Sequence, residues 1–118
     1  MADTDPGQRG TLQVRGRAIE HLVEAAVLTT PGVHRHARAL TGLIGQDLPR
    51  VDAVVAGDHV RTSVAVAAEW GRPLAALSAD ARDRIATALS DHAGLVVDGI
   101  AVHVAAVVPP GARERELQ

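Results

Sequence analysis

The clearest pattern in the chain is the alternation of apolar and polar positions from Val51 to Trp70, which is interrupted at Gly57-Asp58. A two-residue connection of this type between two alternating runs predicts a β-hairpin. The predicted cross-strand pairs are Val55 with Val60, Ala53 with Thr62, and Val51 with Val64. The second run is long for a strand, so its far half requires a different pairing partner.

Two other stretches have the 3.6-residue spacing of helices. The first predicts a helix over Ala18–Thr29 that Pro31-Gly32 terminates, because proline cannot continue a helix and glycine accepts the conformation beyond its end. The second predicts a helix that opens at Pro73 and ends at Gly94. Its apolar stripe comprises Leu74, Leu77, Ala81, Ile85, Ala88, Leu89 and His92.

Three shorter segments complete the predicted fold. Alternation over Thr11–Arg15 and over Val33–Arg38 indicates two short strands, and a last strand follows Asp98-Gly99, with Ile100, Val102, Val104 and Ala106 on one side. The predicted order is β-α-β-β-β-α-β. We therefore expect an α+β domain in which two helices pack on one face of a four- or five-stranded, mostly antiparallel sheet.

A chain of 118 residues is long enough for one domain. We expect the domain over residues 10–108, between an N-terminal tail (1–9) and a C-terminal tail (109–118) that show no apolar periodicity and read as disordered. The stretch from Ala39 to Pro49 is predicted to be a glycine-containing loop.

Composition excludes several classes of function. The net charge of −2 and the pI near 6.3 argue against the basic surface of a nucleic-acid-binding protein. The absence of cysteine excludes disulfides, thiolate metal sites and a cysteine nucleophile. No signal-peptide pattern and no apolar run of about 20 residues is present, so direct membrane insertion is not expected.

Several segments follow one another in a recognisable series. They are Gly10 to Val14, a helix followed by Thr30 to Val33, the Arg61 to Trp70 strand with Gly71 and Pro73 after it, Ala93 to Leu95, and Ile100 to Val104. The series resembles the alkaline shock protein 23 / Gls general-stress family of bacteria over roughly Gly10 to Val108. This chain differs from the family in Trp70, where Tyr or Phe is expected, in having no lysine, and in the polar loop from Gly42 to Gln46.

The resemblance implies a non-enzymatic cytoplasmic protein of envelope stress response and cell envelope homeostasis. A small membrane-anchored partner is expected to recruit it to the inner face of the membrane, and self-association is a further option. The resemblance carries over no catalytic residue, cofactor or metal.

The histidines suggest one alternative. His34 and His36 would lie on the same side of a strand, and His59 or His103 would supply a third ligand for a metal enzyme. Because no metal-binding spacing is present, we interpret these histidines as surface residues. His92 is expected at the core edge, near the helix C-terminus.

Other chemical patterns are weak. Asp80 and Asp83 are interleaved with arginines, as on a solvated helix face. Ser63, Ser78 and Ser90 lack the sequence context of a nucleophile. Residues 42–45 match the GxxG loop of KH-type RNA-binding domains, but Leu43 and Ile44 replace its basic residues. A KH-like RNA-binding protein is therefore the alternative to the stress-protein hypothesis.

The remaining prediction concerns the face of the sheet that points away from the helices. Small and polar side chains there would form a flat platform on which a partner can dock. The predicted partner-binding residues are Arg61, Ser63, Ala65, Ala67, Ala101, His103 and Ala105.

Overall fold

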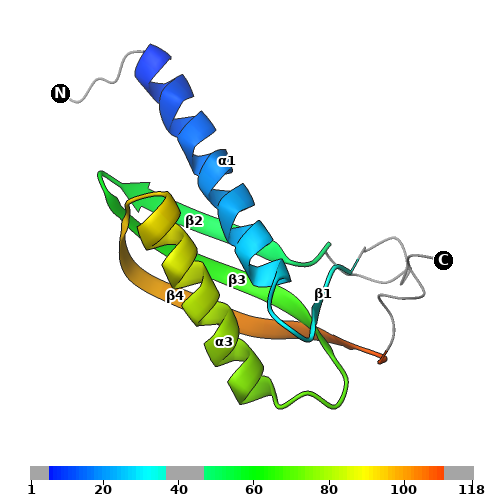
Figure 1. Ribbon diagram of the computed structural model, residues 1–118. Coiled ribbons are helices and arrows are strands. Elements are labelled where there is room, and N and C mark those ends of the chain that lie inside the picture. Colours follow the sequence, from blue (N-terminus) through cyan, green and yellow to red (C-terminus); the bar gives the residue numbers. More distant parts are fainter. Residues whose placement is uncertain (1–5, 37–46, 111–118) are drawn as a thin grey trace.

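The computed structural model describes residues 6–36 and 47–110, with side chains described from Val14 onward. Its element order is α-β-β-β-α-β, with a π-helical turn closing the second helix (Figure 1). The elements are α1 (Pro6–Leu28), β1 (Val33–His34), β2 (Arg50–Ala56), β3 (His59–Glu69), α3 (Leu74–Thr87), the π-helical turn η1 (Ala88–His92) and β4 (Val96–Val108).

Strand β3 is the centre of a four-stranded sheet. The predicted hairpin is confirmed, because β2 pairs antiparallel with the first half of β3 in the predicted register. The far half of β3 pairs antiparallel with β1, through Val33 opposite Ala68 and His34 opposite Ala67. Strand β4 runs parallel to β3 along its other edge, so the sheet is mixed and two of its three pairings are antiparallel.

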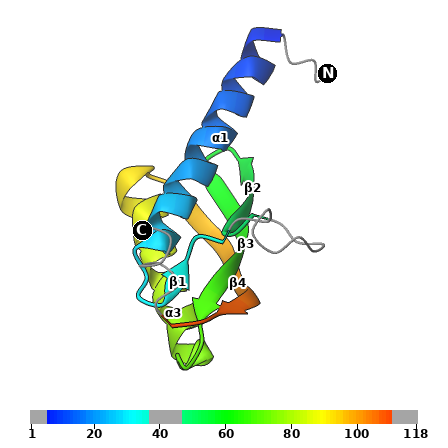
Figure 2. The ribbon, with the colours of Figure 1, turned by 90° about the vertical axis from the view of Figure 1, so that its right-hand side faces the viewer.

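Both helices pack on one face of this sheet, which confirms the predicted α+β class (Figures 1 and 2). Helix α1 lies over β2 and helix α3 lies over β4. The N-terminal part of α1 extends past the end of the sheet (Figures 1 and 2). None of the described helices lies on the opposite face of the sheet.

The main core lies between the helices and the sheet. Apolar residues recur at helical spacing on α1 and α3 and at alternate positions on the strands, so each element turns one face to the core. The fully buried members include Val23, Val27, Val60, Val64, Val66, Ala81, Ile85 and Leu89. The stripe predicted for the second helix is confirmed at Leu77, Ala81, Ile85, Ala88 and Leu89, which are buried. It is wrong at its two ends, because Leu74 and His92 are exposed.

The predicted first strand is wrong, because residues 11–15 lie within α1. Helix α1 begins at Pro6, so residues 6–9 also belong to this helix and not to a disordered tail. Proline is compatible with a first helical turn, and a helix that has formed over residues 17–28 propagates at one hydrogen bond per residue. The five-residue alternation over residues 11–15 favours a strand less strongly than the adjoining helix favours its own extension, because a strand also needs a free sheet edge to pair with.

Other boundaries differ by a few residues. Of the strand predicted for Val33–Arg38, Val33–His34 form β1 and His36 forms a single bridge with Leu48, while residues 37–38 lie outside the described residues. The last strand begins at Val96, before the Asp98-Gly99 step where it was expected to start. The predicted stop at Gly94 is confirmed, because Gly94 has φ 66° and the Leu95 N–H donates to the Leu89 carbonyl at 3.0 Å.

Strand β4 departs from regular pairing at two places. Its register with β3 shifts between Val60 and Arg61 and again between Val66 and Ala67, which makes Asp98 and Ala105 the extra residues.

Within the described residues, no helix is long and apolar enough to cross a membrane.

Candidate interaction surface

The face of the sheet opposite the helices presents most of the side chains that the sequence predicted there. Five of the seven predicted residues are exposed: Arg61, Ser63, Ala101, His103 and Ala105. Ser63 lies opposite Ala101 on β4 and opposite Asp52 on β2, and Arg61 lies opposite Val54, which is 70% exposed. Because residues directly opposite one another share a face, these side chains form one patch. We call this patch of Asp52, Val54, Arg61, Ser63, Ala101, His103 and Ala105 the open face.

The open face combines small side chains with the guanidinium of Arg61. Ser63, Ala101 and Ala105 leave the backbone close to the surface, so another chain can approach it closely. Arg61 lies beside Gly99, where a Cβ atom would be 3.8 Å from both Cγ and Nε of the arginine. No described residue forms an ion pair with Arg61. The patch can therefore accept a partner that brings a carboxylate to Arg61.

Two of the predicted residues, Ala65 and Ala67, are buried and not exposed. They form a second, small apolar cluster with Leu48, Ala106 and Val108. The residues before β2 cross this end of the sheet, where Leu48 and His36 exchange backbone hydrogen bonds at 2.8 and 3.0 Å. The exposed patch lies beside this cluster and reaches it at His103, which is opposite Ala65. An arginine at Ala65 or Ala67 would disrupt the packing of the cluster.

The histidines considered as metal ligands were interpreted from the sequence as surface residues, and this interpretation is wrong for His34, which is buried. His34 is 8% exposed, and its Nε2 is 3.1 Å from Oε2 of Glu69. Its Nδ1 is buried without a partner among the described residues. His36 is half-buried, and His103 lies on the open face. In the part of the chain that the structure describes, no three His, Asp or Glu side chains gather as a metal site would require.

His59 takes part in a local pair at the edge of the sheet. Its Nδ1 is 2.9 Å from Oδ1 of Asp98, and its Nε2 is 3.7 Å from Asp58. The hydrogen bond with the Asp98 carboxylate and its negative charge raise the pKa of His59 above the ordinary 6.5. The imidazole is thus held in its charged form to a higher pH.

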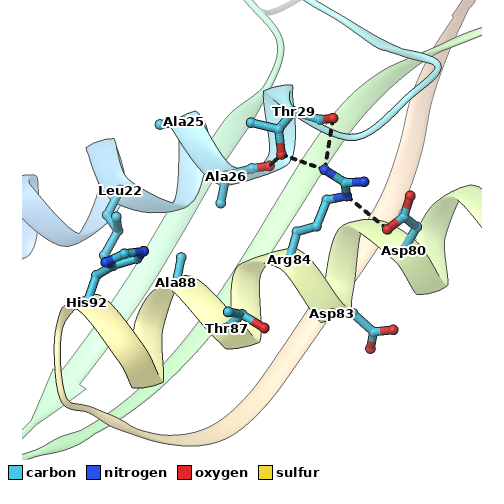
Figure 3. Close-up of a pocket in the computed structure, with 10 residues that line it drawn as sticks. All are labelled: Leu22, Ala25, Ala26, Thr29, Asp80, Asp83, Arg84, Thr87, Ala88 and His92. Atoms are coloured by element: carbon cyan, nitrogen blue, oxygen red, sulfur yellow. Dashed lines mark hydrogen bonds and ion pairs between the residues drawn. The ribbon is translucent and has the colours of Figure 1, made fainter.

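A groove of about 510 Å³ runs between α1 and the α3–η1 segment, away from the sheet (Figure 3). Its walls include Leu22, Ala26 and His92. Arg84 spans it by donating from Nε to Asp80 Oδ1 at 2.9 Å and from Nη1 to the Thr29 carbonyl at 3.1 Å. The guanidinium therefore satisfies a carbonyl at the end of α1 and ties the two helices together.

A second hollow of about 480 Å³ lies at the β3–α3 connection. Trp70, Leu74 and Val107 line it and are 69%, 43% and 47% exposed. Trp70 is the only aromatic residue of the chain, so its exposure gives this corner the largest apolar side chain on the surface. Sequence reasoning missed the corner, although a tryptophan at a strand end before Gly71 was a usable signal.

Asp80 and Ser90, which belong to the acid/base and nucleophile patterns, have local contacts on α3 and η1. Asp80 pairs with Arg84, and Ser90 Oγ donates to the Ala86 carbonyl at 2.9 Å. None of Ser63, Ser78 and Ser90 hydrogen bonds to a histidine in the described region. Residues 42–45 of the GxxG match lie outside the described residues.

The fold has counterparts among solved structures. No protein-family model and no curated protein sequence matches this chain. Similar structures include variants of the MamM CTD, a cation diffusion facilitator C-terminal domain. A zinc form of one variant has a TM-score of 0.53 at 11% identity and covers 79% of this chain and 87% of its own. A triple variant has a TM-score of 0.53 at 13% identity over 79% and 96% of the two chains. At this level of identity the likeness shows a shared fold.

Proposed function

We propose that this protein is a non-catalytic interaction module of the alkaline shock protein 23 / Gls type, acting in bacterial envelope stress response and envelope homeostasis. In this proposal it docks on a small membrane-anchored partner from the cytoplasmic side. The observation that carries the proposal is the open face, a sheet surface that no described helix covers, in which small side chains surround an arginine without an ion-pair partner among the described residues.

The packing of the domain favours binding over catalysis. The helices and one sheet face are used to build the core, and Arg84 of α3 forms a structural pair with Asp80. The open face is shallow, whereas enzyme sites are concave and gather several polar groups. A flat surface of small residues suits docking of another backbone.

The side chains of the open face also indicate which residues its partner would present. Arg61 and His103 flank Ser63 and Ala101, so a partner segment with small residues and a carboxylate would pair with the cation and lie flat between them. Asp52, directly opposite Ser63, restricts such a carboxylate to the Arg61 side. This arrangement gives the partner one preferred orientation.

The experiment is recovery of the tagged chain from gently fractionated cells that produce it. We expect it to co-purify with membranes and with one small membrane protein, and we expect Ser63→Arg to abolish the association. Ala79→Arg, at an exposed position of α3, is the control for added charge. Recovery of RNase-sensitive RNA without a membrane protein would overturn the proposal in favour of the KH-like alternative.

A further inference from the structure

The outer edge of β4 is a long unpaired strand edge in the described part of the molecule. Strand β4 has 13 residues, and no described strand pairs with its outer edge. Exposed sheet edges present unpaired N–H and C=O groups, and proteins blunt them with charges, prolines or short strands. From Gly99 to Val108 the only ionisable residue is His103, and proline is absent.

The other free edge of the sheet is better protected. Strand β2 has only seven residues, and its exposed positions include Arg50 and Asp52. The Nε atom of Arg50 is 3.8 Å from Oδ2 of Asp52. This contrast singles out β4 as the edge that can accept another strand.

The side chains along β4 are partly uncovered where a new strand would add packing. Ile100, Val102 and Val104 face the helix side and contact the core, yet all three are only half-buried. A strand paired to β4 would bring its own side chains against this row. Burial of the remaining apolar surface would then add to the hydrogen bonds of the ladder.

We infer that β4 pairs antiparallel with β4 of a second copy of this chain, about a two-fold axis through Val102, to form one continuous sheet. In this register Val102 faces Val102 of the second copy, Ile100 faces Val104, and Ala101 faces His103. Every facing pair on the helix side is then β-branched, and each His103 lies against a small alanine. All five pairs fall between the irregular positions Asp98 and Ala105.

Neighbouring registers satisfy fewer of these conditions. An axis through His103 places the extra residue Ala105 within the ladder and sets two imidazoles directly opposite each other. An axis through Ala101 leaves Val104 without a partner between the irregular positions.

An isologous contact of this kind closes as a dimer and leaves no further β4 edge for growth. The inference goes beyond the proposed function, since it rests on the unpaired backbone edge of β4, although Ala101 and His103 belong to both surfaces.

The absence of cysteine in the chain allows a direct test of this register. Facing residues of an antiparallel pair have Cα atoms about 4.5–5.5 Å apart, within the range of a disulfide, whereas diagonal neighbours are about 7–8 Å apart. Under mild oxidation, Val102→Cys should form a covalent dimer by itself. Ala101→Cys alone and His103→Cys alone should each form no covalent dimer. A mixture of the two variants should form a mixed disulfide.

Sedimentation velocity of the unmodified chain complements the crosslinking. We expect a species of twice the 12.3 kDa chain mass that dissociates on dilution. Val102→Lys places two ammonium groups opposite each other and should yield the monomer, whereas Val54→Lys on β2 should leave the dimer intact. A monomer at every concentration of the unmodified chain would overturn the inference. Crosslinking of His103→Cys alone, without crosslinking of Val102→Cys, would also overturn it.

Discussion

Two glycines with the same backbone torsion provide a sharp test of how the corner between β1 and α3 is packed. Gly32 and Gly71 both have φ 91°, a conformation that side-chain-bearing residues rarely adopt. A Cβ atom at Gly32 would lie 2.9 Å from Cδ1 of Leu77 and 3.1 Å from Cγ of Arg72. A Cβ atom at Gly71 would meet nothing within 4 Å.

The two alanine variants therefore share the backbone cost and differ in the steric cost. Positive φ costs an alanine about 1–2 kcal/mol, which is the loss of unfolding free energy expected for Gly71→Ala. Gly32→Ala adds an overpacking cost of about 1–3 kcal/mol, because Leu77 is only 5% exposed and cannot move away freely. The Gly32 carbonyl also accepts the Glu69 N–H at 2.8 Å, so the loop cannot lift away without losing that bond.

Urea denaturation followed by circular dichroism measures the difference. With a slope of about 1–2 kcal/mol per molar, the midpoint of Gly32→Ala should lie about 1 M below that of Gly71→Ala. In a Leu77→Val background, which lacks the Cδ1 atom, the two substitutions should cost nearly the same. Equal costs in the unmodified background would refute the reasoning, since they would show that Leu77 yields without penalty.

Three further predictions concern individual contacts. Asp98→Asn should return the pKa of His59 toward 6.5 in an NMR titration. Because the folded pKa of His59 is raised, the stability that Asp98 contributes should be full between about pH 5 and 6.5 and lost as pH rises through the His59 pKa. A difference in unfolding free energy between the variant and the unmodified chain that stays constant across pH would contradict this. Arg84→Met should lower the unfolding free energy by about 1 kcal/mol by leaving the Thr29 carbonyl without its donor, and no loss would show that water replaces it. Trp70→Ala should change the unfolding free energy by less than about 1 kcal/mol, because the indole is exposed. In the unmodified chain, the emission of this lone tryptophan should shift little on unfolding. A large blue shift of that emission in the folded protein would show that the indole is covered.

Patterns with local causes were predictable from the sequence. The Gly57-Asp58 turn fixed the hairpin register pair by pair, because a two-residue loop leaves one register and the β-branched residues then share a face. The stops at Pro31-Gly32 and Gly94 also follow from backbone chemistry, and both glycines have positive φ. The long second strand required another partner, and β1 supplies it.

Features that depend on distant parts of the chain were not predictable. Alternation over Thr11–Arg15 fits a strand or an amphipathic helix, and continuity with the rest of α1 decides for the helix. The burial of Ala65 and Ala67 depends on where Leu48 crosses the sheet, which no local pattern specifies. Periodicity alone placed Trp70 at the end of a strand and did not specify its exposure, although its position before Gly71 was a usable signal for the corner.

The most direct test of the proposed function is the binding of the purified membrane-anchored partner to open-face variants. Once the partner is identified by co-purification, calorimetry should show that Ser63→Arg loses binding at least tenfold while Ala79→Arg binds like the unmodified chain, because only the first places a charged side chain on the platform beside Arg61. Undiminished binding of Ser63→Arg, with the fold intact by circular dichroism, would contradict the open face as the docking surface.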